Sequence, residues 1–202
     1  MLVADRLSRA KLRAELGRCT IGREVIVLEQ TTSTNDVVLQ MANSGAPEGL
    51  VVFAEYQSAG RGQRGNAWES AAGKGLWFSV LLRPKVAISD PVELAQRTAQ
   101  IVATAIQNEF HLLATVKLPN DIYLENRKVA GVLIEMRAQP KGPHLVVLGI
   151  GVNVNQMPHD FPEELRGRAI SLAIARHGPI DRFSFAVALL RNLDLLYCAD
   201  PL

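Results

Sequence analysis

Cysteine and histidine are scarce in this chain, and neither occurs at a spacing typical of metal ligands. Only Cys19 and Cys198 occur among 202 residues, near opposite ends and without a CxxC motif. This excludes a disulfide framework and favours a reduced, cytoplasmic protein. No histidine has the i,i+4 or cysteine-partnered spacing of a zinc site; the four are His111, His144, His159 and His177.

Long apolar runs and an excess of one charge are also missing. No apolar run approaches the length of a membrane span, and residues 1–16 are charged without the apolar core of a signal peptide. Lys plus Arg number 22 and Asp plus Glu number 20, giving a net charge of +2. Binding to duplex nucleic acid is not predicted, although a local basic pocket for one small anion is compatible with this balance. We expect no contact with DNA or a membrane.

The composition is that of a globular protein, with 48% hydrophobic and 21% charged residues. We expect a single domain over residues 1–202. The patterns predict helices at 5–16, 37–42, 91–110 and 182–196, and strands at 24–29, 50–54, 76–82, 114–117, 121–124, 129–137 and 145–152. Strands outnumber helices and mostly follow one another as hairpins. The sequence therefore predicts an α+β fold with a mixed, largely antiparallel sheet covered by helices.

A glycine-rich loop, GRGQRGNAW at Gly60–Trp68, carries the strongest chemical signal. It contains GxGxxG, the pattern of a dinucleotide-binding turn. That turn needs a helix at the third glycine and an acidic residue at a strand end about 20 residues later. The residues that follow this loop are poor helix formers and no such acidic residue occurs, so a dinucleotide-binding fold is not predicted. Glycines let backbone N–H groups approach a ligand, and Arg61 and Arg64 offer forked donors for carboxylate or phosphate. Trp68 can cover a flat group. We predict a loop that closes over an anionic ligand; the alternative is a solvated loop of turns.

Four further segments are weak signals when taken singly. Ser33-Thr34-Asn35 is explained by helix capping, and Lys117-Leu118-Pro119-Asn120-Asp121 by a turn between strands. Lys128 beside Gly131 could reach a ligand on the sheet or could be a solvated hairpin lysine. Two glycines in Gly149-Ile150-Gly151-Val152-Asn153 indicate close approach by a ligand, a bulge or tight packing.

The order of these motifs along the chain resembles the catalytic domain of biotin protein ligases. The matching runs are Thr32-Ser33-Thr34-Asn35, Glu55–Gly62, Lys117–Asp121, Lys128–Gly131 and Gly149–Asn153. The resemblance covers about residues 25–196. It implies the fold of biotin and lipoate ligases, which is similar to that of class II aminoacyl-tRNA synthetases.

The resemblance also implies a reaction in two steps. The biotin carboxylate attacks the α-phosphate of ATP, with Mg²⁺, to give biotinyl-5′-AMP and pyrophosphate. A lysine of a biotin carboxyl carrier protein then takes the biotinyl group and AMP leaves. Neither step needs an enzyme nucleophile, so catalysis would depend on positioning and on neutralising phosphate charge.

The resemblance assigns the catalytic roles to Lys128, at the biotin carboxylate and α-phosphate, and to Arg61 of the loop. Ser33, Thr34, Asn35 and Gln57 would bind the ureido head of biotin. The remaining residues would contact the adenylate or the nucleotide, or would line the floor of the pocket. They are Gly60, Gly62, Gln63, Arg64, Trp68, Asn120, Asp121, Gly131, Gly149, Gly151 and Asn153. The metal ligands stay unassigned.

The chain departs from the family pattern at three points. Gln63 stands where GRGRxGRxW has arginine, and Leu118 where KWPND has tryptophan. We also expect no C-terminal SH3-like domain and no N-terminal DNA-binding domain. Family members commonly pair through a sheet edge, so a homodimer is compatible with the resemblance. Two alternatives stay open: a lipoate or octanoate ligase or transferase of the same fold, and a non-catalytic biotin-binding paralogue.

Overall fold

Seven strands form one sheet in the computed structural model, which describes residues 6–84, 90–137 and 144–199. The spatial order is β1-β2-β3-β7-β6-β5-β4. Strands β1 and β2 are parallel and every other neighbouring pair is antiparallel, which confirms the predicted sheet. The strands are β1 Glu24–Thr31, β2 Leu50–Gln57, β3 Gly75–Leu82, β4 Thr115–Lys117, β5 Asp121–Leu124, β6 Arg127–Arg137 and β7 Leu145–Asn153.

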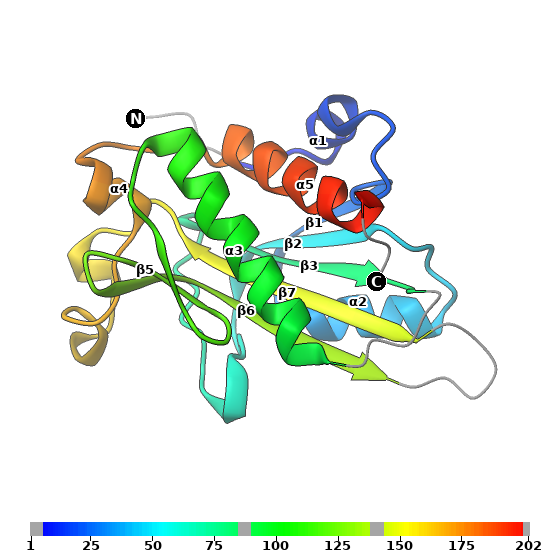
Figure 1. Ribbon diagram of the computed structural model, residues 1–202, viewed down its shortest axis with the longest axis horizontal. Coiled ribbons are helices and arrows are strands. Elements are labelled where there is room, and N and C mark those ends of the chain that lie inside the picture. Colours follow the sequence, from blue (N-terminus) through cyan, green and yellow to red (C-terminus); the bar gives the residue numbers. More distant parts are fainter. Residues whose placement is uncertain (1–5, 85–89, 138–143, 200–202) are drawn as a thin grey trace.

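Helices cover both faces of the sheet (Figure 1). The long helices α3 and α5 lie across one face, and α2, which connects the parallel strands β1 and β2, lies on the other. The helices are α1 Arg9–Leu16, α2 Thr34–Asn43, α3 Pro91–Phe110, α4 Leu172–Arg176 and α5 Arg182–Ala199. Short 3₁₀ turns occur at η1 Gln63–Gly65, η2 Pro158–Asp160 and η3 Glu163–Leu165. None of the described helices is both long and apolar enough to cross a bilayer.

Local signals explain most element boundaries. Asp90 caps α3 by accepting a hydrogen bond from Val92 N at 2.8 Å, with proline at the first helical position. Glu125 and Asn126 have φ values of 49° and 60°, as a tight hairpin between β5 and β6 requires. The first helix begins at Arg9 rather than at Asp5, which lies outside the described residues. The short helix α4 was not predicted, because five residues are too few for a periodic pattern.

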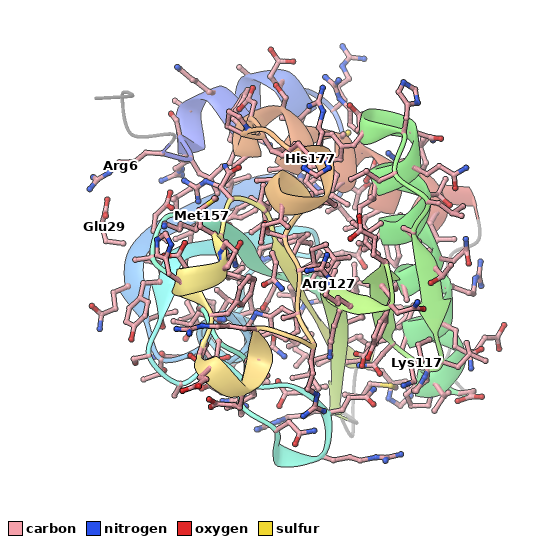
Figure 2. The ribbon with its side chains drawn as sticks, turned by 90° about the vertical axis from the view of Figure 1, so that its left-hand side faces the viewer. Arg6, Glu29, Lys117, Arg127, Met157 and His177 are labelled. Carbon is pink, nitrogen blue, oxygen red and sulfur yellow. The ribbon has the colours of Figure 1, made fainter. Side chains whose placement is uncertain are left out.

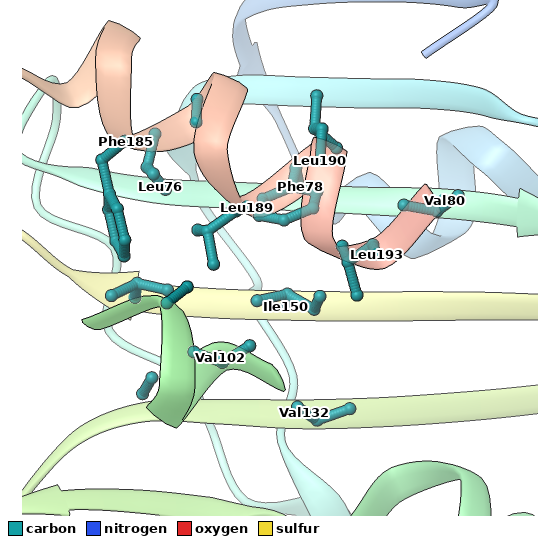
Figure 3. Packing of buried hydrophobic residues seen from close by; sticks show 14 of the residues in the cluster. Leu76, Phe78, Val80, Val102, Val132, Ile150, Phe185, Leu189, Leu190 and Leu193 are labelled. Atoms are coloured by element: carbon teal, nitrogen blue, oxygen red, sulfur yellow. The ribbon is translucent and has the colours of Figure 1, made fainter. Parts of the chain in front are cut away.

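The main core lies between the sheet and the helices α3 and α5. Alternate residues of β3, namely Leu76, Phe78 and Val80, point to this face because side chains alternate along a strand. Figure 3 shows these side chains near Leu189, Leu190 and Leu193 of α5, and it shows Val102 of α3 between Ile150 and Val132. The opposite face has a smaller cluster under α2, formed by Val38, Ala42, Leu50, Val52, Leu81, Leu145 and Val147. The sheet thus has one face packed with mostly apolar side chains under α3 and α5 and a smaller apolar cluster on the other face.

A buried ion pair joins the ends of several elements. Arg182, at the start of α5, donates to Glu55 Oε2 of β2 at 2.7 Å and to the Gly75 carbonyl of β3 at 3.1 Å. The other carboxylate oxygen of Glu55 accepts from Leu7 N at 3.1 Å. Arg182 is 1% exposed and Glu55 is 7% exposed. Burial of a charge is costly unless it is paired, so both charges depend on this contact.

Substitution of Arg182 tests this dependence. R182M leaves the Glu55 carboxylate buried without its cation, so the free energy of unfolding should fall by about 3–5 kcal/mol. Urea denaturation followed by circular dichroism measures it. The matched control is R191M, which removes an exposed pair with Glu15 and should cost less than about 1 kcal/mol. Similar losses in both variants would contradict the role given to Arg182.

Candidate functional site

The candidate site lies on the α2 face of the sheet, beyond the start of that helix. Gly131 pairs with Gly151, and Gly149 pairs with both Leu133 and Ser79, so these positions share one face. Glycines replace the large apolar side chains found further along the same strands. These three glycines line a cavity of about 280 Å³.

Fifteen of the seventeen predicted site residues line this cavity. They are Ser33, Thr34, Asn35, Gln57, Arg61, Gly62, Gln63, Arg64, Trp68, Asn120, Asp121, Lys128, Gly131, Gly149 and Gly151. The two departures from the usual motifs, Gln63 and Leu118, also lie here. The fold therefore brings five separate stretches of sequence to one place.

Gly60 and Asn153 are not among the lining residues. Gly60 lies under the loop, where its carbonyl accepts from Trp68 N at 2.9 Å and an added Cβ would lie 2.6 Å from the Trp68 carbonyl oxygen. The Asn153 amide donates to the Ile170 carbonyl at 3.1 Å and accepts from Gln156 at 3.1 Å. Gly60 thus stabilises the base of the loop, and Asn153 stabilises the segment that follows β7. These contacts are with other parts of the protein and not with the cavity.

A buried polar cluster occupies one end of the cavity. Thr34 N donates to Gln57 Oε1 at 2.8 Å, and the hydroxyls of Thr34 and Ser79 are 2.7 Å apart. Ser79 donates in turn to Asn35 Oδ1. Ser33, Thr34 and Asn35 are buried, and the Ser33 side chain makes no capping hydrogen bond, so capping alone does not explain this motif. Sequence reasoning missed Ser79, although a lone serine in the apolar run LWFSVLL was a usable signal.

Lys128, Asp121 and Trp68 meet in another part of the cavity. Lys128 Nζ lies 2.7 Å from Asp121 Oδ1 and 5.2 Å from the centre of the Trp68 ring, at cation–π distance. The indole lies on the floor: an added Cβ would be 2.6 Å from the ring at Gly151 and 3.0 Å from it at Gly131. Glycine is required at Gly151, because any Cβ would displace the Trp68 ring.

Arg61 is held by carboxylates at the edge of the cavity. Its two terminal nitrogens each lie 2.7 Å from an oxygen of Asp36, and Nη2 lies 3.5 Å from Glu135. The hydrogen bonds from Arg61 lower the pKa of Asp36, and the same contacts raise the pKa of the guanidinium. Sequence reasoning missed Asp36 and Glu135, since neither belongs to a motif that indicates a ligand.

The loop that carries Arg61 folds back on itself and projects beyond the sheet (Figure 1). Gly62 N donates to the Asn66 carbonyl at 2.8 Å, and Arg61 forms a bridge with Ala67. Arg64 has φ 57° at the tip of the loop. The loop is thus a short hairpin-like arm whose arginine reaches back to α2 and β6.

The site has no ready-made metal cage. Within the described ranges, no group of three or more His, Cys, Asp or Glu side chains could hold an ion. Asp121 is the carboxylate among the described lining residues. Because Mg²⁺ is usually held by one or two carboxylates together with substrate phosphates, this donor set suits a metal that arrives with a nucleotide.

Comparison with known families agrees with this geometry. Residues 27–153 match the model of the biotin/lipoate A/B protein ligase family, which is more than half of the chain. The chain belongs to this family. The match includes every described residue that lines the cavity, and it ends before the helices α4 and α5.

Individual relatives place the chain among the biotin protein ligases. The bifunctional ligase/repressor BirA of Bacillus subtilis is 37% identical over 88% of this chain, which spans 54% of that relative. The biotin--[acetyl-CoA-carboxylase] ligase of Mycobacterium tuberculosis is 36% identical over 93% of this chain and 70% of its own length. The biotin protein ligase of Aquifex aeolicus, solved with biotin and ATP, has a TM-score of 0.74 at 30% identity, over 87% of this chain and 71% of its own. The chain thus spans about half the length of the Bacillus relative.

The acidity of Asp36 tests the Arg61 contact. A folded-state pKa below that of an unfolded aspartate means that the pair stabilises the fold above about pH 4 and that this stabilisation is lost as the pH falls through the lowered value. Carboxyl NMR titration should give a midpoint below that of ordinary aspartate, and R61A should raise it. Asp160 serves as control. Burial raises its pKa, the hydrogen bonds from Lys74 and Met157 outweigh that effect so that the pKa is lowered overall, and R61A should not change it. An unchanged Asp36 midpoint in R61A would contradict the assigned cause.

Proposed function

We propose that this chain is an ATP-dependent biotin ligase that forms biotinyl-5′-AMP and transfers biotin to a lysine of a biotin carboxyl carrier protein. The observation that carries the proposal is one glycine-floored cavity with a buried polar cluster in one part and Lys128 in another. This arrangement suits a ligand with a polar head and an anionic tail. The Aquifex relative solved with biotin and ATP, and the Mycobacterium relative named for a carboxylase, support the choice of substrates.

The first step would need two anions brought together. The biotin carboxylate attacks the α-phosphate of ATP, and pyrophosphate leaves with the electrons of the broken P–O bond. The Lys128 ammonium would draw both anions to one point and offset their repulsion, which is catalysis by positioning and charge. Asp121 would then release Lys128 and could hold Mg²⁺, which with ATP supplies further neutralisation of the phosphates.

The second step would use the open side of the cavity. A lysine amine of the carrier protein attacks the acyl carbon of the adenylate, and AMP leaves. Arg61 and Arg64, both on the loop, would retain the adenylate until the carrier arrives. Trp68, lying on the glycine floor, would pack against the adenylate.

A lipoate ligase is the nearest rival, and the polar cluster distinguishes the two. The head of biotin is a cyclic urea with two N–H donors and a carbonyl, whereas the dithiolane head of lipoate has no such groups. Thr34, Asn35 and Ser79 are buried polar groups that a dithiolane would leave without ligand partners. The cluster therefore favours biotin.

The direct test combines the purified chain with biotin, ATP, Mg²⁺ and an apo carrier domain. We expect release of pyrophosphate, then release of AMP and formation of a biotinylated lysine. An enzymatic assay measures pyrophosphate and AMP, and mass spectrometry detects the modified lysine. A parallel reaction with lipoate should give neither product. Tight biotin binding without pyrophosphate would identify a binding protein instead, and turnover with lipoate alone would overturn the proposal.

Replacement of Lys128 tests its catalytic role. K128A should slow adenylate formation by about 10²-fold, the loss typical for one preorganised charge-stabilising group. The matched control is K74A, which removes the ion pair between Lys74 and Asp160, 2.5 Å apart. Neither residue is among the described residues that line the cavity. Pyrophosphate release under single-turnover conditions measures both variants. Normal turnover of K128A would refute the role.

Replacement of Arg61 separates retention of the intermediate from binding of biotin. R61A should speed loss of the adenylate by about tenfold or more, since a hydrogen bond to a charged group contributes about 1.5–3 kcal/mol. Biotin affinity measured by calorimetry should fall less than the adenylate lifetime measured by filter retention. Equal losses would contradict a position at the phosphate.

A further inference from the structure

We propose that Glu135 is a positioning residue that joins the two halves of the site, by fixing the Asn35 amide with its carbonyl towards the cavity and by holding Arg61 beside it. This inference rests on the proposed function, because it concerns how the site recognises a cyclic urea. The residue lies on β6, where it follows Gly131 and Leu133 on the same face of the sheet. Its side chain is 39% exposed at the edge of the site.

The first step of the argument is the direction of one hydrogen bond. Asn35 Nδ2 lies 2.6 Å from Glu135 Oε2. A carboxylate can only accept hydrogen bonds, so the NH₂ end of the Asn35 amide must face Glu135. The Oδ1 end then faces Gly149, where an added Cβ would lie 2.4 Å from it.

The direction of this bond sets the rest of the polar cluster. With Oδ1 facing inward, Asn35 accepts from the Ser79 hydroxyl, which spends its single proton there. Ser79 must then accept from Thr34 across their 2.7 Å contact, which is shorter than the 3.2 Å from the Thr34 hydroxyl to Gln57 Oε1. The order of donors is Thr34 to Ser79 to Asn35 to Glu135, and the carboxylate at its end is what fixes that order.

This order determines what the cavity offers to a ligand. The second lone pair of Asn35 Oδ1 and the lone pairs of Thr34 Oγ1 remain as acceptors beside the cavity. Acceptors are the partners that the two N–H groups of a cyclic urea require. Without the carboxylate, the Asn35 amide can turn and present N–H donors, and the match to the urea is lost.

The same carboxylate reaches the loop. Arg61 Nη2 lies 3.5 Å from both oxygens of Glu135, while the bidentate bond to Asp36 holds the guanidinium from the other side. Glu135 therefore contacts one residue from the head-binding cluster and one from the loop proposed to retain the adenylate. Through Glu135, the position of the loop is coupled to the orientation of Asn35.

The test uses E135Q, which keeps the shape of the side chain and removes its charge. Calorimetry should compare biotin with a tetrahydrothiophene pentanoate that lacks the ureido ring. Loss of a charge-assisted hydrogen bond should weaken biotin binding about tenfold and binding of the analogue less than twofold. The biotin Kd should thus rise while kcat at saturating biotin and ATP changes less than about threefold.

The matched control is E29Q, which removes an exposed carboxylate paired with Arg6 at 2.9 Å. Figure 2 shows this pair far from Lys117 at the cavity. E29Q should leave the preference for biotin over the analogue unchanged. If E135Q keeps full biotin affinity, or loses affinity for both ligands equally, Glu135 does not orient the site and the proposal fails.

A second measurement needs no ligand and keeps this proposal separable from the proposed function. The side-chain amide of Asn35, assigned by its loss in N35D, should give shifted and slowly exchanging NH₂ resonances in the ligand-free protein. E135Q should weaken both properties, because an amide oxygen is a weaker acceptor than a carboxylate and the amide no longer enforces one direction, and E29Q should not. Unchanged Asn35 resonances in E135Q would overturn the proposal, whereas failure of the unmodified chain to bind biotin would count against the proposed function alone.

Discussion

Everything in the site depends on the close approach that three glycines permit on one face of a well-packed sheet. The opposite face is filled by the helices α3 and α5, which hold the strands at fixed spacing. On the α2 face, large residues such as Leu81 and Val147 pack under the helix, and glycines follow further along the same sheet. Beyond the start of α2, side chains such as Asn35 and Trp68 can therefore lie directly on the backbone of the sheet. A single Cβ at Gly149 or Gly151 would collide with Asn35 or Trp68.

Polar burial is the second constraint, and it connects stability with specificity. Asn35 is 4% exposed and Thr34 is 3% exposed, so each unpaired donor or acceptor there would cost about 1–3 kcal/mol. The chain pairs these groups with one another and with Gln57 and Glu135. Their remaining lone pairs are directed by that network, and an apolar head would cover them without satisfying them. On the proposed function, discrimination between ligand heads would thus follow from how the groups of this cluster are paired within the protein.

Sequence patterns predicted the elements and most of the lining residues, because both depend on local signals. Alternating apolar residues, the Asp90 cap and the turn at Glu125 and Asn126 act over a few positions. Most of the lining residues were assigned through the resemblance to biotin protein ligases, which depends on the order of the motifs along the chain. The partners of those motifs could not be read in this way, because Asn35 and Glu135 are 100 residues apart and meet only through the pairing of the strands. The same limit applies to Asn153, whose neighbours Ile170 and Gln156 belong to a segment without a periodic pattern.

The cations of the candidate site are paired with carboxylates, which bears on the anion binding that we propose. Lys128 is paired with Asp121, and Arg61 with Asp36, so neither cation is left uncompensated in a half-buried place. An anionic ligand must displace these carboxylates or share their cations, which reduces affinity for any single weak anion. A ligand that presents a carboxylate and a phosphate together gains both cations at once. Each exchange replaces an ion pair within the protein by an ion pair with the ligand. The binding energy of a ligand with a carboxylate and a phosphate therefore comes from the geometry of the two cations rather than from net charge. On the proposed function, this would explain how a chain with a net charge of +2 selects a doubly anionic reaction centre.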